Sequence, residues 1–180
     1  MVIALAGRRI DAPEAQETRF PLSMKEAVGQ RLRDFFTRRE ATSLVCSAAC
    51  GADLLALDAA GEVGIRCRIV LPFSPERFRE TSVTDRPGDW GPLYDRIAER
   101  IAASGDLVVL PDGGDQDDAY AATNEAILDE ALQLARGKGE GDVLAVIVWE
   151  GRTRGEGDLT DAFAASALAR GIEVAEVLTR

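Results

Sequence analysis

The feature that most constrains the fold is an alternation of short, continuously apolar runs with longer amphipathic stretches. Six runs rich in apolar residues have the length of strands, and they occupy residues 2–6, 43–47, 66–71, 106–110, 142–149 and 172–178. Apolar residues recur at helical spacing in residues 22–38, 51–62, 92–103, 117–136 and 158–170. This order predicts an α/β fold: a doubly wound, mostly parallel, six-stranded Rossmann-like sheet with helices on both faces.

Length and charge narrow the classes of protein. The 180 residues show neither a linker nor an internal repeat, which predicts a single domain over residues 1–180. The net charge of −10 is expected to repel both nucleic acid and anionic membranes. Since the longest apolar run is too short to span a bilayer and the N-terminus lacks a signal-peptide pattern, we expect a cytoplasmic protein.

The residue types that are present limit the chemistry. The chain has no histidine, which excludes a Ser-His-Asp or Cys-His triad within it and any imidazole ligand for a metal. Any general acid or base must therefore be Asp, Glu, Lys, Tyr or Cys. Cys46, Cys50 and Cys67 are odd in number and lack the spacing of a disulfide framework. We predict neither a disulfide scaffold nor a metal site.

Ligands of doubly wound sheets bind beyond the carboxyl ends of the strands, so the loops at that edge are the candidate site. The first strand ends in Gly7-Arg8-Arg9, which is either a tight turn with two guanidinium groups that clamp a phosphate, or a surface turn with solvated arginines. The third strand is followed by a long irregular stretch, 73–91, which we expect to be an ordered loop. Its Ser82, Arg86 and Trp90 could form a lid, or its aromatic residues could only anchor it to the core.

Small residues lead from the second strand into the next helix, from Ser47 to Asp53. They would let an anion reach the backbone N–H groups of the first helical turn, around Gly51 and Ala52. They would equally allow close packing of the strand on the helix without any ligand. Asp53 could cap the helix or bond a ribose hydroxyl.

The helix predicted over 117–136 begins among aspartates, whose charge suits the positive end of the helix dipole; a magnesium site is the alternative reading of Asp112, Asp115, Asp117 and Asp118. Tyr120 and Asn124 lie four residues apart at the start of the core-facing stripe of this helix. An asparagine there needs a hydrogen-bond partner, which is either a backbone group or a ligand.

The fifth loop, 151–161, is rich in glycine and leads from a strand into a helix. Its Gly155 and Gly157 could cradle a phosphate or simply turn the chain. Trp149 could stack on a base or pack in the core. Asp158 or Thr160 is expected to cap the following helix.

These segments together resemble the SLOG superfamily, a Rossmann-like group that includes DprA and the LOG phosphoribohydrolases. The resemblance is carried by LAGRR, SAACGADLLAL, VLPF and VWEGRTRGEGDLTDAFAASALARGIEV, which together extend over nearly the whole chain. Gly51-Ala52-Asp53 looks like the Gly-Ala-Asp signature of the superfamily. The terminal segment is similar to a Trp-Asp-Gly…Gly-Gly-Thr-Ala-Asp pattern of a bacterial nucleotide-sensor branch.

The resemblance implies a site for a nucleotide-derived ligand, lined by Gly7, Arg8, Ser47, Gly51, Asp53, Gly155, Gly157 and Thr160. LOG enzymes carry Pro-Gly-Gly-x-Gly-Thr-x-x-Glu with a catalytic glutamate, whereas residues 155–161 read Gly-Glu-Gly-Asp-Leu-Thr-Asp. The Gly-Gly pair and that glutamate are both missing here. The residue patterns and the resemblance together give the candidate ligand-binding set Gly7, Arg8, Arg9, Ser47, Gly51, Ala52, Asp53, Tyr120, Asn124, Trp149, Gly155, Gly157, Thr160 and Asp161.

Three functions are therefore open. The first is a sensor that binds a nucleotide or a nucleotide derivative, with no other cofactor required. The second is a phosphoribohydrolase or nucleosidase that cleaves an N-glycosidic bond with Asp53, Asp161 or Glu156 as the acid. The third is an interaction domain without a ligand. The expected partners are a nucleotide-like small molecule, a second copy of the chain or an effector protein, with neither nucleic acid nor membrane.

Overall fold

The structure is a computed structural model that describes residues 1–111, 115–139 and 141–180. Six parallel strands form one sheet in the order β4-β3-β2-β1-β5-β6. The strands are β1 (Val2–Gly7), β2 (Ser43–Cys46), β3 (Arg66–Leu71), β4 (Leu107–Val109), β5 (Val143–Trp149) and β6 (Glu173–Leu178). The predicted α/β fold is confirmed, and every strand pair in the sheet is parallel.

Helices connect successive strands, as the amphipathic stretches predict. They are α1 (Lys25–Arg38) after the short turn η1 (Leu22–Met24), α2 (Ala52–Glu62), α4 (Gly91–Ala103), α5 (Gln116–Lys138) and α6 (Leu159–Ala169). In the part of the chain that the structure describes, no helix is both long enough and apolar enough to cross a membrane.

The stretch 73–91 differs from the long irregular loop that the sequence predicts. It contains α3 (Pro75–Phe78), which continues into the π-helical turn η2 (Arg79–Val83). Ser74 accepts a hydrogen bond from the backbone of Arg77, and Pro75 occupies the first turn, where its missing N–H costs nothing. This start was readable in the sequence as Ser-Pro-Glu, but the two turns are too short to show a helical period.

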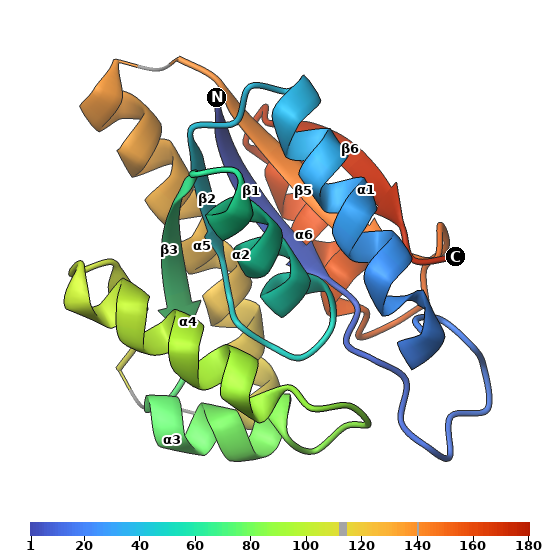
Figure 1. The fold of residues 1–180 in the computed structure, drawn as a ribbon. Coiled ribbons are helices and arrows are strands. Elements are labelled where there is room, and N and C mark those ends of the chain that lie inside the picture. The colour runs from blue at the N-terminus through green and yellow to red at the C-terminus, as the bar shows by residue number, and fades with distance from the viewer. Residues whose placement is uncertain (112–114, 140) are drawn as a thin grey trace.

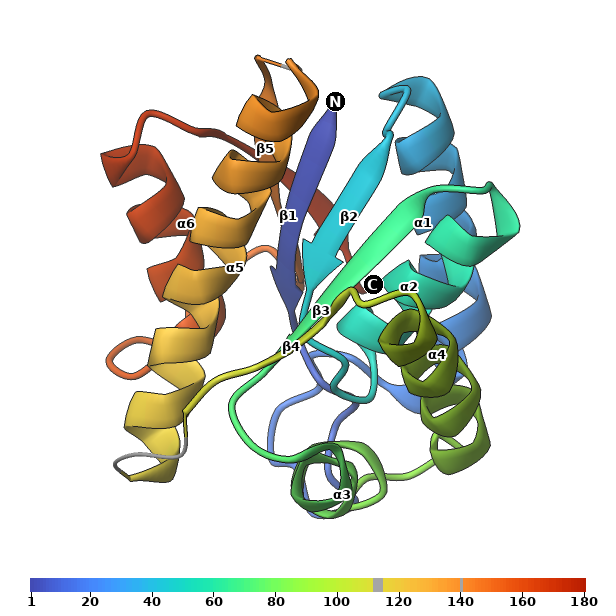
Figure 2. The same cartoon turned by 90° about the vertical axis from the view of Figure 1, so that its left-hand side faces the viewer.

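Helices cover both faces of the sheet (Figure 1). Alternate residues of β1 enter different cores: Ile3 and Leu5 pack with α1, α2 and α4, whereas Ala4 and Ala6 pack with α5 and α6. Figure 2 shows the sheet between these two helical layers. The central strands β1, β2 and β5 are buried along almost their whole length and are nearly continuously apolar, whereas the edge strands β4 and β6 are partly exposed.

The connections reverse direction between β1 and β5. From β1 the chain proceeds through β2 and β3 to β4, and it then returns through α5 to β5 on the other side of β1. Such a switch point leaves a crevice beyond the carboxyl ends of the strands. In Figure 2 these ends lie at the bottom, together with α3 and the connecting loops.

Candidate functional site

A cavity of about 640 Å³ lies at this carboxyl edge, and segments far apart in the chain form its walls. They are the end of β1 with the loop after it, the start of α2, the turn η2, the first turns of α5 and the start of α6. Ten of the sequence-predicted residues line it: Gly7, Arg8, Arg9, Ser47, Asp53, Ser82, Arg86, Tyr120, Asn124 and Thr160. The other predicted residues, namely Gly51, Ala52, Trp90, Trp149, Gly155, Gly157 and Asp161, are not among the residues that form its walls.

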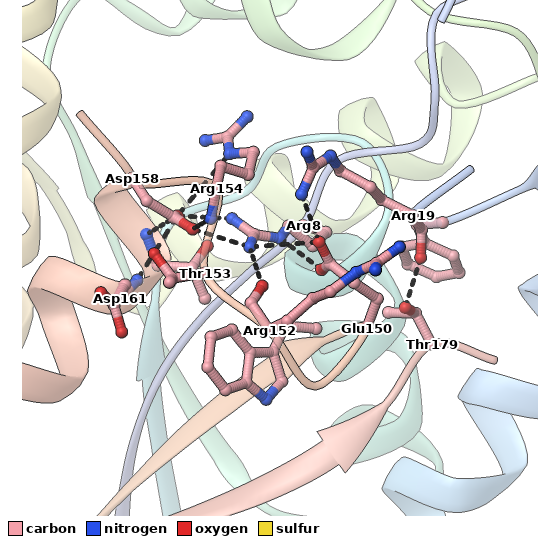
Figure 3. A network of polar contacts seen from close by, with 12 residues as sticks. Arg8, Arg19, Glu150, Arg152, Thr153, Arg154, Asp158, Asp161 and Thr179 are labelled. Carbon is pink, nitrogen blue, oxygen red and sulfur yellow. Dashed lines mark hydrogen bonds and ion pairs between the residues drawn. The ribbon is translucent and has the colours of Figure 1, made fainter. Parts of the chain in front are cut away.

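Arg8 is held by the chain itself (Figure 3). Its Nε donates to Glu150 at 2.7 Å, and its Nη1 and Nη2 donate to Asp158 at 2.5 and 2.8 Å. Nη2 also donates to the carbonyl of Arg152 at 3.1 Å. Every nitrogen of the guanidinium thus has an acceptor within the chain, and the phosphate clamp predicted for Arg8 is corrected: it ties β1 to the β5–α6 loop.

The charges of this group support one another. Burial would lower the pKa of Arg8, but the hydrogen bonds and charges of Asp158 and Glu150 raise it instead. Burial would likewise raise the pKa of Asp158, yet the hydrogen bond from Arg8 and the N–H of Arg154 hold that pKa well below its ordinary value. All three side chains are nearly inaccessible to solvent, at 3% for Arg8, 0% for Glu150 and 1% for Asp158. The group is therefore fully ionised and structural at neutral pH.

Asp158 also organises the glycine-rich loop. Its carboxylate accepts from the backbone of Thr160 at 3.0 Å and of Arg154 at 2.8 Å, so it is the N-cap of α6, one of the two predicted caps. Gly155 and Gly157 are exposed, with positive φ values of 91° and 78°. They turn the loop and are not among the residues that line the cavity, so the phosphate cradle expected at these glycines stays a prediction.

The two tryptophans that were predicted as site residues are both buried in the fold. Trp149 is buried in the core beneath α5 and α6, and its Nε1 donates to Glu176 at 2.8 Å. Trp90 is 1% exposed, and its Nε1 donates to the carbonyl of Pro87 at 2.8 Å. For Trp149, the structure favours packing in the core over stacking on a base. For Trp90, it favours anchoring of the loop over a lid.

The small residues at the start of α2 serve a close crossing of backbones. A Cβ on Gly51, whose φ is 103°, would lie 2.8 Å from the carbonyl of Arg8 and from the nitrogen of Ile10. A Cβ on Gly7 would lie 2.4 Å from that of Ala52. Only glycine fits at these points. The structure therefore favours close packing as the reason for the small residues.

Two backbone N–H groups around the start of α2, where an anion was expected to bind, are also engaged. The N–H of Ala52 donates to the carbonyl of Arg8 at 3.0 Å, and that of Cys50 donates to the carbonyl of Ser82 at 3.0 Å. These bonds fix the exit of β1 and the turn η2 against the start of α2. An anion at this point would have to displace them.

Asp53 and Ser47 remain as polar side chains of this segment that face the cavity. Asp53 is 7% exposed and lies within a buried helix; one carboxylate oxygen accepts from the N–H of Ala49 at 3.2 Å. Burial raises the pKa of Asp53 to about 7, against the opposing effects of the Ala49 N–H and the charge of Arg9. The Oγ of Ser47 is buried without a hydrogen-bond partner in the described chain. Asp53 is not the N-cap of α2, which is Gly51.

Tyr120 and Asn124 line the cavity from α5. The hydroxyl of Tyr120 lies 2.6 Å from the Oγ of Ser82, and the Nδ2 of Asn124 donates to the carbonyl of Leu159 at 2.9 Å. Asn124 thus has the backbone partner that was one of its two expected partners. These bonds join α5 to η2 and to α6, and they set the width of the cavity between them.

The start of α5 has acidic residues where their charge suits the positive end of the helix dipole. Asp115 is the N-cap and accepts from the backbone N–H groups of Asp117 and Asp118 at 2.7 and 3.2 Å. The proposed aspartate cluster also included Asp112, which lies outside the described residues. Among the residues that the structure does describe, no group of three or more acidic or cysteine side chains could hold a metal ion.

Sequence reasoning missed several residues of the cavity and its support. Arg154 lines the cavity, and Arg19 lines it while donating to Glu150 at 2.5 Å. The carboxylate of Asp11 accepts from the backbone of Arg19 and Phe20 and so shapes the loop between β1 and α1. Glu150 carried the one usable signal, since an acidic residue directly after a buried strand needs a cationic partner.

Comparisons with known proteins add little beyond the fold. No protein-family model matches the chain, and no curated protein matches it. Among solved structures it is similar to the X-ray structure of DNA processing protein A (DprA) from Streptococcus pneumoniae, with 17% sequence identity and a TM-score of 0.44. The match covers 96% of this chain and 57% of that chain. The likeness concerns the fold alone.

The expected exclusion of nucleic acid as a partner does not stand. The similar structure is described as that of a DNA processing protein, which is a description of that protein alone, and the net charge of −10 cannot by itself exclude nucleic acid. Net charge is a sum over the whole chain and does not fix the local field. Five arginines line the cavity, namely Arg8, Arg9, Arg19, Arg86 and Arg154, together with the acidic residues Asp11, Glu17 and Asp53. Nothing in the described residues identifies a second copy or an effector protein as a partner.

Proposed function

We propose that this chain binds a nucleotide or a nucleotide-derived small molecule in the cavity at the carboxyl edge, and that it acts as a sensor module. One observation carries the proposal: the cavity is open, and two residues that line it have buried polar atoms with no partner in the described chain, the Oγ of Ser47 and the Nε of Arg9. An unsatisfied buried polar atom costs about 1–3 kcal/mol, which a ligand hydrogen bond would recover.

The composition of the walls suits such a ligand. A volume of about 640 Å³ is typical of small-molecule sites. The half-buried Ala12, Ala49 and Tyr120 supply apolar surface for a base, and Ser47 and Asp53 supply polar groups for a sugar. The open cavity also disfavours the interaction domain without a ligand, for which bulky side chains filling this edge were expected.

Calorimetric titration with mono-, di- and cyclic nucleotides tests the proposal. We expect one of them to bind at one site per chain and to raise the melting temperature, because a ligand that binds only the folded state stabilises it. The variant Ser47→Ala should fold at least as stably as the wild type, since the lost hydroxyl has no partner, yet it should bind that nucleotide more weakly. Absence of binding by the whole panel would contradict the proposal.

Hydrolysis of an N-glycosidic bond is a second candidate, and Asp53 is the observation that favours it. A carboxyl group with a pKa of about 7 that lines the cavity is suited to protonate a leaving base. Asp161 and Glu156, the other acids considered, do not line the cavity. Release of free base from a nucleoside monophosphate by the wild type, but not by Asp53→Asn, would establish this activity; a flat time course for every monophosphate would exclude it.

A further inference from the structure

The five arginines that line the cavity fall into two groups by their ion pairs. Arg8 lies 2.7 Å from Glu150 and 2.5 Å from Asp158, and Arg19 lies 2.5 Å from Glu150. Arg9 makes a close ion pair with Asp85. Each of these three guanidinium groups is bound to a carboxylate at hydrogen-bonding distance, which neutralises its charge, although the Nε of Arg9 has no partner in the described chain.

Arg86 and Arg154 form the second group. The Nε of Arg86 lies 3.7 Å from Asp85, and the Nε of Arg154 lies 3.7 Å from Asp158, both beyond hydrogen-bonding distance. Within the described chain, neither guanidinium makes a hydrogen bond. The carboxylate that each one faces is already taken by an arginine of the first group, Asp85 by Arg9 and Asp158 by Arg8. Arg86 and Arg154 therefore carry positive charge that the chain does not neutralise closely.

The positions of these two arginines suit ligand capture. Arg86 follows the turn η2, and Arg154 belongs to the loop between β5 and α6, so they reach the cavity from different connections. Their side chains are 28% and 45% exposed, which leaves them accessible from solvent while they line the cavity. Figure 3 shows the Arg154 side chain extending beyond the closely bonded group around Arg8.

We infer that Arg86 and Arg154 form an anion-binding subsite of the cavity, which receives a phosphate group of the ligand. The inference rests on the proposed function and narrows it to phosphorylated nucleosides. A guanidinium presents paired N–H donors that match the oxygens of a phosphate, and charge-assisted hydrogen bonds of this kind are the strong ones. The subsite replaces the one predicted at Arg8, whose donors the chain has already used.

Calorimetry with matched ligands tests the subsite: a nucleoside, its 5′-monophosphate and its 5′-diphosphate, for each common base. The variants are Arg86→Gln, Arg154→Gln and the double substitution. Arg152→Gln is the matched control, because this exposed arginine belongs to the same loop and its side chain does not line the cavity. Thermal melting shows whether each variant folds. If Arg154→Gln does not fold, Arg154→Lys replaces it in the titrations, because lysine keeps the positive charge but lacks the planar pair of donors.

We expect each single substitution to weaken the phosphorylated ligands about tenfold and the double substitution about a hundredfold, as for loss of hydrogen bonds between charged groups. Binding of the unphosphorylated nucleoside should change little, and Arg152→Gln should bind all ligands like the wild type. Added salt should weaken phosphate binding in the wild type more than in the double variant.

Two failures are distinguishable. If the wild type binds a phosphorylated nucleoside and the folded double variant binds it equally well, the subsite is overturned while the proposed function stands. If the wild type binds none of the ligands, the proposed function fails and the subsite fails with it.

Discussion

Asp53 places a carboxyl group in a buried helix whose neighbouring side chains are apolar. Its neighbours on α2, Leu54, Leu55 and Ala56, are all buried, and within the described chain the Asp53 carboxyl makes one hydrogen bond, which it accepts from the N–H of Ala49. Desolvation of a carboxylate is costly, and here it raises the pKa from 3.8 to about 7. A carboxyl group whose pKa is shifted this far, beside a cavity, is a candidate functional residue.

The raised pKa fixes the sign of a pH effect. Since the folded state holds this proton more tightly than the unfolded state, the stability of the wild type should fall as pH rises from about 4 to 7 and level off above it. Asn at this position can still accept the Ala49 N–H but has no charge. We therefore expect Asp53→Asn to raise the free energy of unfolding by up to about 4 kcal/mol at pH 8, and by much less at pH 4.

Urea denaturation across this pH range measures the effect. Asp58→Asn is the control, because Asp58 lies on the same helix with a side chain that is 37% exposed and pairs with the exposed Arg96; its substitution should change stability little at any pH. Lower stability of Asp53→Asn than of the wild type at pH 8 would show that the carboxylate is stabilised in the fold.

Unlike Asp53, the buried group of Arg8, Glu150 and Asp158 stabilises the fold when its side chains are ionised. We expect Arg8→Met to lower the free energy of unfolding by about 3–5 kcal/mol at pH 7, because two buried carboxylates lose the cation that joins them, although Glu150 keeps its pair with Arg19. The pKa values of Asp158 and Glu150 are lowered in the fold, so their ion pairs stabilise it above about pH 4 and are lost as pH falls further. The deficit of the variant should therefore narrow toward acid pH.

Arg33→Met is the comparison for this substitution. Arg33 pairs with Glu62 at 3.0 Å, and their side chains are 31% and 51% exposed. Loss of so exposed a pair should cost less than about 1 kcal/mol. Equal effects of the two substitutions at pH 7, measured by urea denaturation, would show that the buried group does not organise this edge.

At the scale of elements, the strands and long helices follow from the sequence because their patterns are local. The run Val2–Gly7 is apolar throughout since both faces of β1 are covered, and α1 and α4 show one apolar face each. The short α3 and η2 were missed because four and five residues cannot display a period. Arg8 was misread for another reason: its partners Glu150 and Asp158 lie 142 and 150 residues away in the chain.

Gly51 tests the close crossing of the β1 exit over the start of α2. We expect Gly51→Ala to lower the free energy of unfolding by more than about 3 kcal/mol, because its φ is 103° and a Cβ would lie 2.8 Å from backbone atoms. Gly64 also has a positive φ, 75°, but a Cβ there would meet nothing within 4 Å. Gly64→Ala should therefore cost only about 1–2 kcal/mol. Equal losses for the two in urea denaturation would argue against the crossing.

At the scale of the whole molecule, the sequence could predict where the cavity lies but not how its side chains are used. A doubly wound sheet dictates a crevice at the switch point between β1 and β5, and the cavity is there. Which polar groups are free for a ligand depends on pairings across the fold. Those pairings use up Arg8 and Asp158 and leave Ser47, Asp53, Arg86 and Arg154 around the open volume.

The central claim is that this cavity, and no other surface, holds a nucleotide-derived ligand. Mapping of backbone amide chemical shifts by NMR, during titration with the tightest-binding nucleotide of the panel, tests it most directly. We expect the perturbed amides to concentrate in residues 5–9, 47–53, 82–86, 120–127 and 154–160, the segments that meet at the cavity. Perturbations confined to another surface, such as the groove between α1 and β6 around Arg31 and Leu178, or none at saturating nucleotide, would contradict the claim.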